Sequence, residues 1–425
     1  MPMTMDAWVA AAIFVIAYIL IALERWDRTI VAMLGGLLVI GLGIIDQHEA
    51  FAAIDLNVIF LLAGMMVIAS ILARTGFFDW IAIRSVILSD GHPMRLLLIL
   101  ATVTAVLSAF LDNVTTVVLM TPITLSVAKR LGVSPTPYLI SGILASNIGG
   151  TATLIGDPPN ILIGSAAGLG FDDFLFNLGP VTVLVFLAFI VIVRISFRGH
   201  LQVPDERREA ALERTEENTI KDRPLLVKAL VVSGATIAGF LVHSMIGLEP
   251  ATIALAGAMV LMLIGGLDAH KTLREIEWST LFFFVGLFIL VEAIVQVGIV
   301  GAIADGLATA TNGQPALATI GLLWFSAIAS AIIDNIPYTA TAIPVVQRLA
   351  ETGMAVEPLW WALALGACLG GNLTIVGASA NVVVANIAQR AGHPIRFFEF
   401  LRYGAVVVLA SMVISTGYLW VRYLA

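Results

Sequence analysis

The chain has 425 residues, of which 60% are hydrophobic and only 12% are charged. Because a soluble globular domain carries about 25% charged residues, this composition excludes that class and predicts an all-α polytopic membrane protein. The net charge of −7 says little about partners, since the position of charges in a membrane protein matters more than their sum. The single cysteine, Cys368, excludes an internal disulfide.

Ten apolar segments are predicted to be membrane spans, five in each half of the chain. The first is expected to be a retained helix, because no basic residue and no clear cleavage site mark it as a signal peptide. Two further apolar stretches, 96–128 and 318–346, each contain an Asp-Asn pair near the middle and are predicted to be re-entrant hairpins. The ten predicted spans are 7–23, 29–45, 57–73, 138–168, 177–196, 226–246, 251–267, 279–298, 360–388 and 399–423.

The two halves repeat each other. Ser108–Asn113 corresponds to Ser330–Asn335 with a shift of 222 residues, and Gly149–Thr153 corresponds to Gly370–Thr374 with a shift of 221. Because each half holds five spans, an odd number, the second copy must lie upside down relative to the first. The sequence therefore predicts inverted-topology repeats, a frequent plan among secondary transporters.

These features divide the chain into three parts. Residues 1–196 are the first inverted repeat, with a hairpin at about 96–128 and a broken helix at 138–168. Residues 226–425 are the second, with a hairpin at about 318–346 and a broken helix at 360–388. Residues 197–225 are a charged linker, which we expect to be solvated and partly helical.

The distribution of basic residues predicts the orientation. With the linker in the cytoplasm, 20 of the 22 Lys and Arg residues face the same side, and only Arg348 and Arg422 lie outside. This bias agrees with the positive-inside rule. We therefore expect a multi-pass protein of the inner (plasma) membrane with both termini outside.

The hairpin tips carry the polar groups of a predicted transport site. Half-helices that meet inside a membrane present unpaired backbone groups, and their dipoles attract ions. The two tip aspartates would add titratable carboxylates, although Asp is also a common helix N-cap. Recurrence at corresponding positions favours a transport role. The candidate tip residues are Asp112, Asn113, Thr115, Thr116, Asp334 and Asn335.

The two broken helices each carry a glycine pair next to polar side chains. Paired glycines allow a ligand to approach the backbone, while close helix packing by small residues is the common alternative. Asp157 has no acidic counterpart in the second copy and is either a ligand of the coupling ion or a turn residue before two prolines. The candidate binding residues here are Asn147, Gly149, Gly150, Thr151, Asp157, Asn160, Gly370, Gly371, Asn372, Thr374 and Asn381.

Other function classes find little support. The chain contains no Gly-x-x-x-x-Gly-Lys-Ser/Thr loop, so this chain is not expected to bind ATP as its energy source. It shows no zinc-type His/Cys cluster and no nucleophilic triad spacing. We therefore expect no enzyme activity, no catalytic residue, no metal site, no cofactor and no nucleic-acid partner.

Three segments of the sequence resemble the ArsB/NhaD family of the ion transporter superfamily. They are Ser108–Pro122, Asn147–Asn160 and the hairpin segment Ser330–Pro344. Within it they are most similar to the branch shared with the melanosomal P protein. The resemblance covers essentially the whole chain in its span plan. It implies an elevator-like fold, in which a transport domain of two hairpins and two broken helices sits beside a scaffold domain, with the substrate and ion sites at the tips.

The resemblance implies substrates as different as arsenite and antimonite, Na⁺ with H⁺, silicic acid and, more distantly, dicarboxylates. Arsenous acid is uncharged at neutral pH and suits Asn, Thr and backbone partners, whereas the lack of a basic residue inside any motif disfavours a dicarboxylate. We therefore expect a secondary active transporter that exports arsenite or antimonite in exchange for protons, with Asp112 and Asp334 as proton or ion carriers.

Two alternatives to arsenite export stay open. One is a Na⁺/H⁺ antiporter of the NhaD type that uses the same acids, and the other is a permease for another small inorganic or organic anion. A channel or non-transporting scaffold is a third and different class. Besides protons and the lipid bilayer, the candidate partners are an arsenical ATPase subunit and a second copy of this chain in a homodimer.

Overall fold

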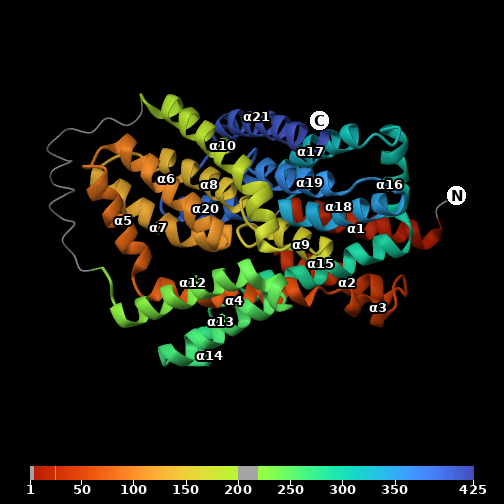
Figure 1. The fold of residues 1–425 in the computed structure, drawn as a ribbon, viewed down its shortest axis with the longest axis horizontal. Coiled ribbons are helices and arrows are strands. Elements are labelled where there is room, and N and C mark those ends of the chain that lie inside the picture. Colours follow the sequence, from red (N-terminus) through yellow and green to blue (C-terminus); the bar gives the residue numbers. More distant parts are fainter. Residues whose placement is uncertain (1–3, 24, 200–218) are drawn as a thin grey trace.

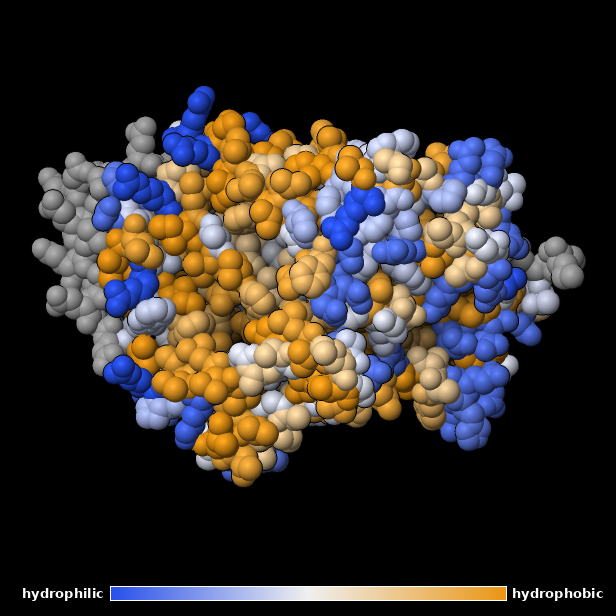
Figure 2. All heavy atoms as spheres, viewed as in Figure 1, coloured by the Kyte–Doolittle hydropathy of each residue, from blue (hydrophilic) through white to orange (hydrophobic). Residues whose placement is uncertain are grey.

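A computed structural model describes residues 4–23, 25–199 and 219–425, and within these ranges the chain forms helices without any β-strand (Figure 1). Nine of the described helices are long and apolar enough to cross a membrane. Hydrophobic side chains cover much of the left and middle of the face seen in Figure 2, and hydrophilic ones gather towards its two ends. The predicted all-α polytopic fold is confirmed.

Each helix of the first repeat has a counterpart in the second, in the same chain order. The first repeat contains α1 (Met5–Leu23), α2 (Arg28–Gly41), α3 (Gln47–Ala52), α4 (Leu56–Arg74), α5 (Phe77–Leu88), α6 (Pro93–Phe110), α7 (Asn113–Leu131), α8 (Thr136–Gly150), α9 (Pro158–Ala167) and α10 (Phe171–Phe197). The second contains α12 (Arg223–Ile246), α13 (Pro250–Gly265), α14 (Ala269–Leu273), α15 (Trp278–Gln296), α16 (Ile299–Ala310), α17 (Pro315–Ile332), α18 (Asn335–Glu351), α19 (Glu357–Gly370), η1 (Ile375–Gly377), α20 (Ser379–Arg390), α21 (Phe397–Leu419) and η2 (Trp420–Leu424).

Aspartate side chains start several of these helices. An Asp carboxylate at the N-cap accepts hydrogen bonds from backbone amides that have no partner inside the helix. Asp27 begins α2, and Asp55 begins α4 in this way. Asp112 and Asp334 do the same for α7 and α18, the returning arms of the two hairpins. The acids in this apolar chain therefore have a structural role in addition to any transport role.

We call α1–α4 together with α12–α15 the scaffold domain, a name taken from the elevator-like plan that the resemblance predicts. Within it, α2 packs along α15 and α4 packs along α13. Small residues permit this close approach, because a Cβ added to Gly286 would lie 2.5 Å from the backbone of Ala32, and one added to Gly64 would lie 2.7 Å from the backbone of Ala254.

We call the hairpins, the broken helices and α10 with α21 the transport domain, again after the predicted plan. In it, α6 packs along α8, α17 along α19, and α10 along α21. The first hairpin (α6, α7) lies in the left half of Figure 1, and the second (α17, α18) lies to its right, so the corresponding elements of the two repeats approach the centre from different sides. This arrangement brings the tips and the helix breaks together.

The structure differs from the predicted spans at several places. The spans expected at 29–45 and 251–267 are shorter helices, α2 and α13. The helices α5 and α16 lie outside the predicted spans; α5 contacts α7, and α16 contacts α18, so each adjoins one hairpin. Residues 200–218, most of the predicted 197–225 linker, lie outside the described residues.

Candidate functional site

The first tip, Asp112–Thr116, is a buried helix start. The chain leaves α6 in extended conformation at Leu111, and the Asp112 carboxylate then accepts hydrogen bonds from the backbone amides of Val114 and Thr115, both at 2.9 Å. The Thr115 hydroxyl also donates to this carboxylate. Asp112 keeps only 6% of its surface exposed. Its negative charge is thus held by the N-terminus of α7 and by a hydroxyl, without a Lys or Arg in contact.

The second tip, Asp334–Thr339, repeats this backbone with different partners. The Asp334 carboxylate accepts from the Ile336 amide at 3.0 Å and from the hydroxyl of Ser379, the first residue of α20. The Nη1 atom of Arg28, from the scaffold helix α2, lies 3.6 Å from Asp334 Oδ2 and also donates to the Ser379 hydroxyl. This tip therefore has a cation beside its acid.

Four asparagines from both repeats form an amide cluster between the tips, consisting of Asn113, Asn147, Asn372 and Asn381. Asn147 lies at its centre, because its Nδ2 donates to the Oδ1 atoms of Asn372 and Asn381, each at 2.9 Å, and its Oδ1 accepts from Asn113 at 3.2 Å. All four side chains are buried. The cluster joins the first tip to both broken helices.

The asparagines after each break hold its irregular backbone. Asn160 Nδ2 donates to the carbonyl oxygen of Thr153 at 2.8 Å and to that of Thr151 at 3.1 Å. In the second repeat, Asn381 Nδ2 donates to the carbonyl oxygens of Gly371 and Thr374, at 2.8 and 2.9 Å. Such bonds satisfy carbonyls that the broken helices leave without an intrahelical partner. Asn160 and Asn381, both predicted as binding residues, thus also stabilise the backbone of the two breaks.

Asp157 is fully buried at the start of α9. Asn335, from the second tip, donates to its carboxylate at 3.1 Å. The carboxylate makes no capping bond to the backbone of α9, so the reading of Asp157 as a simple turn residue loses support. Thr151 donates its hydroxyl to the Asn147 carbonyl, and Thr374 donates to the Ala331 carbonyl, which places both threonine hydroxyls in backbone bonds.

The glycine pairs serve packing in this structure. A Cβ on Gly149 would lie 2.0 Å from the carbonyl oxygen of Ala105 on α6, and one on Gly370 would lie 2.4 Å from the backbone of Ala327 on α17. Gly150 and Gly371 instead face the backbone on the far side of their own breaks. Close helix packing therefore explains Gly149 and Gly370, and the tight backbone of each break explains Gly150 and Gly371.

Two buried polar atoms on α7 have no hydrogen-bond partner. They are the Oδ1 of Asn113 and the Oγ1 of Thr116, in side chains that are 2% and 0% exposed. A buried polar group without a partner is costly, and natural proteins rarely retain one without a reason. Residues three apart lie on one helix face, so these two atoms share one face of α7 at the first tip.

A cavity reaches the first tip from the scaffold. Its volume is about 320 Å³, and it is lined by Thr115 of α7 and by the ends of α4 and α15, including Arg74, Glu275 and Glu277. Arg74 and Glu275 form an ion pair with 2.8 Å between Nη2 and Oε1. The tip is therefore next to a charged entrance rather than to a uniformly apolar wall.

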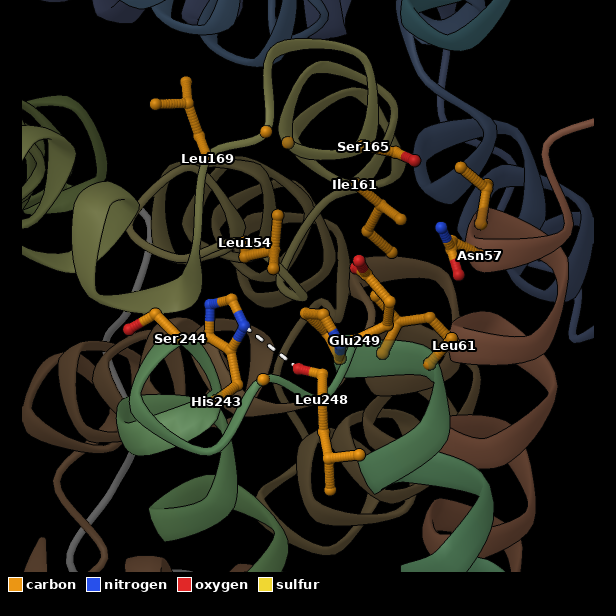
Figure 3. Close-up of a pocket in the computed structure, with 16 residues that line it drawn as sticks. Asn57, Leu61, Leu154, Ile161, Ser165, Leu169, His243, Ser244, Leu248 and Glu249 are labelled. Atoms are coloured by element: carbon orange, nitrogen blue, oxygen red, sulfur yellow. Dashed lines mark hydrogen bonds between the residues drawn. The ribbon is translucent and has the colours of Figure 1, made fainter.

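A second cavity of about 320 Å³ lies between α4, α9 and the α12–α13 turn (Figure 3). Figure 3 shows the side chains of Asn57, Glu249 and Ser165 around it, and the His243 ring, whose Nδ1 lies 3.3 Å from the Leu248 carbonyl oxygen. Like the first cavity, it separates the scaffold from the transport domain. Among the described residues, no group of three or more His, Cys, Asp or Glu side chains is placed to hold a metal ion.

Arg28 and Ser379 are the site residues that the sequence did not reveal. Arg28 lies outside every repeat motif, and only tertiary packing brings it to the second tip. No basic residue lies inside any motif, but Arg28 reaches the second tip from outside them, so the argument against a dicarboxylate no longer holds. Ser379 follows the glycine-containing break, where the first repeat has Pro158, so its hydroxyl was visible in the sequence but its partner was not.

The sequence matches the family model described as citrate transporter (CitMHS) over residues 18–366. The chain belongs to this family. An uncharacterized transporter of Mycobacterium tuberculosis is 45% identical over 98% of both chains. The P protein of Mus musculus is 34% identical over 99% of this chain and 61% of its own length. These matches confirm the similarity to the P protein, while the narrower ArsB/NhaD assignment is not what the family model names.

Among solved structures, the YdaH transporter of Alcanivorax borkumensis aligns with a TM-score of 0.59 over 98% of both chains, at 14% identity. At this identity the likeness concerns the fold alone. Together with the apolar helices, the family shows that this chain is a multi-pass membrane protein and a secondary transporter. The family model and the mycobacterial relative are both described as transporters.

Proposed function

We propose that this chain is a cation-coupled secondary transporter in which Asp112, Asp157 and Asp334 bind the coupling ion. The observation that carries the proposal is the burial of three carboxylates between the tips and the breaks, with exposures of 6% for Asp112 and 0% for Asp157, and 12% for the Asp334 side chain. Intramembrane acids are costly and are commonly found on ion or substrate pathways.

Charge balance favours a cation at this site. The three acids and the one arginine, Arg28, leave an excess of two negative charges when all are ionised. The donors around them are amides and hydroxyls, which stabilise a carboxylate without neutralising it. A proton or Na⁺ would reduce this excess and lower the cost of burial. We propose H⁺ as the coupling ion, with Na⁺ as the alternative.

For the substrate, we propose a small organic acid first. Two observations support this choice: the family is described as citrate transporters, and Arg28 supplies the cation that an anionic substrate group would need at the second tip. Arsenite or antimonite export, our expectation from the sequence, is the second candidate. The neutral amide cluster favours it, because arsenous acid would bind through hydrogen bonds alone. The third candidate is a Na⁺/H⁺ antiporter, which would exchange these two ions and carry no other substrate.

The movement we propose is that of the transport domain against the scaffold. The two cavities lie between these domains, so part of the surface between them is not closely packed, which supports such a movement. We also propose that the protein lies in the inner membrane, with the linker in the cytoplasm and both termini outside. The positive-inside bias of the sequence supports this orientation. A homodimer and an arsenical ATPase subunit remain predicted partners.

Uptake by purified protein in proteoliposomes tests this proposal. Labelled citrate, arsenite and Na⁺ are offered separately, each under an imposed pH gradient, a Na⁺ gradient or neither. We expect saturable citrate uptake that a pH gradient accelerates and that excess unlabelled citrate exchanges. Uptake of arsenite alone would replace the first substrate candidate by the second. Flux that neither saturates nor exchanges, for every solute, would indicate a channel and contradict the proposal.

A further inference from the structure

The contact between Arg28 and the second tip crosses from one domain to the other. Arg28 is the first residue of the scaffold helix α2, and its guanidinium lies 5.2 Å from the ring centroid of Phe283 on the scaffold helix α15. From this fixed position it pairs with Asp334 and donates to Ser379, which belong to two different elements of the transport domain. The positive end of a helix dipole disfavours a cation at this position, so the partners across the interface offset that cost.

This contact has no counterpart in the other half. The repeat shift of 222 places Pro250, the first residue of α13, where α2 has Arg28, and it places Asp112 where the second tip has Asp334. The shift of 221 places Pro158 where the second repeat has Ser379. Neither proline can donate a hydrogen bond or pair with a carboxylate. Asp112 instead bonds to Thr115 within its own hairpin.

Inverted repeats give this asymmetry a consequence. In such transporters the opposite orientation arises when one part of the molecule moves against the other. Because the repeats are inverted, we expect the interdomain contacts of one repeat to be taken over by the corresponding residues of the other. The exchanged contact would bring Pro250 to Asp112, and no ion pair could form there. We infer that Arg28 is an interdomain latch, which stabilises the present orientation by pairing with Asp334 and Ser379 and has no equivalent in the opposite orientation.

The latch ties ion binding to movement. A proton or Na⁺ on Asp334 removes the attraction for Arg28, so occupation of this acid frees the transport domain. The charged or titratable groups near this contact are Arg28 from α2, Asp157, which shares Asn335 of the second tip, and Glu277 at the start of α15, whose charge interacts with Arg28. This inference rests on the proposed function, because it assigns Asp334 to the coupling ion. Arg28 acts through Asp334 and is therefore a positioning residue.

Cross-linking between the domains tests the latch without any substrate. In the present orientation, the Tyr18 hydroxyl of α1 lies 2.7 Å from the Thr341 hydroxyl of α18. A parent protein with Tyr18→Cys and Thr341→Cys is treated in detergent with a short bifunctional thiol reagent at alkaline pH without Na⁺. The native Cys368 is buried, and protein without the two substitutions serves as the blank.

In this parent, Arg28→Gln is expected to lower the cross-linked fraction about two- to fivefold, the range for a partly exposed ion pair. Arg28→Lys should retain most of it. Arg25→Gln removes the same charge from an exposed position in the preceding turn and should change nothing. Asp334→Asn should match Arg28→Gln, and adding it to Arg28→Gln should have no further effect.

Equal cross-linking of the parent and Arg28→Gln would overturn the latch. A parent pair that fails to react would overturn it too, because the orientation with the contact would then not be populated. The proposed function fails separately: if the wild-type protein shows no ion-coupled flux in proteoliposomes, the cross-linked fractions still decide whether Arg28 holds the two domains together.

Discussion

Ser108 and Ser330 make the same bond in the two repeats: each donates its hydroxyl to a backbone carbonyl of the neighbouring broken helix, at 2.7 Å. Asn147 and Cys368 also occupy corresponding positions, but they differ in what they bind. Asn147 makes three side-chain bonds to other asparagines, whereas Cys368 contacts Asn160 at 3.4 Å and also interacts with Asp157 and Thr151. The repeats thus share the bonds that shape the backbone and differ in the side chains that fill the site.

The remaining differences follow the same rule. The first repeat supplies the buried acid Asp157 where the second has Ala378, and the scaffold supplies Arg28 to the second tip where the first has no cation. If the two repeats exchange conformations as inverted repeats do, we expect the two orientations to surround the acids with different side chains.

The largest effect should come from removing the unequal acid. Asp157→Asn keeps the shape and an oxygen acceptor for Asn335 but removes the charge, and we expect gradient-driven substrate uptake to fall to background while the protein remains folded. The measurement is uptake in proteoliposomes together with the elution profile from size-exclusion chromatography. Asp305→Asn, an exposed acid on α16, is the matched control and should transport normally. Normal coupled uptake by Asp157→Asn would make Asp157 a structural residue.

The shared glycines should matter to the fold and not to the choice of substrate. Gly149→Ala would place a Cβ 2.0 Å from the Ala105 carbonyl oxygen, and overpacking of this kind costs about 1–3 kcal/mol or more. We expect a lower thermal unfolding temperature in detergent, with unchanged substrate preference in whatever protein survives. Gly142→Ala, on the same helix with open space around its Cβ, should be neutral. A folded Gly149→Ala variant with altered substrate preference would restore the ligand-binding reading.

A substitution that makes the two repeats alike at the central position of the amide cluster should destabilise the cluster. Asn147→Cys copies the residue of the second repeat and removes three hydrogen bonds, each of which contributes about 1 kcal/mol. Transport should decline by about tenfold or more, and the unfolding temperature should decline as well. Asn386→Cys, an exposed asparagine on α20, should leave both quantities unchanged. Wild-type transport by Asn147→Cys would show that the cluster does not organise the site.

The smallest effect should come from the orphan hydroxyl of the first tip. Thr116→Val removes an unpartnered buried group without changing its shape, so stability should stay the same or increase slightly. If this hydroxyl contacts the substrate, the KM for substrate should rise by about tenfold or less, the equivalent of one hydrogen bond. Thr319→Val removes another buried and unpartnered hydroxyl, on α17, and should leave KM unchanged. An unchanged KM in both variants would place the contact elsewhere.

Much of this arrangement could be predicted from the sequence. The repeat is visible when the two halves are aligned, and polar residues inside apolar segments are informative because burying a polar group is costly. Asp112 and Asp334 are at helix starts as their pattern predicted. The partner of Asn147 across the repeats, and the approach of Arg28 to Asp334, depend on long-range packing and leave no local pattern. The glycine pairs show a further limit of sequence analysis. A bound ligand and a closely packed helix both require a residue without a Cβ, so the sequence alone does not distinguish them.

The central claim is that the tip acids couple an ion to substrate movement, and one experiment tests it directly. In proteoliposomes, substrate exchange without gradients is compared with accumulation driven by a pH gradient, for the wild type and for the double variant Asp112→Asn, Asp334→Asn. We predict that the double variant retains exchange but no longer accumulates substrate when the gradient is applied. Accumulation at the wild-type level in the double variant would contradict the account.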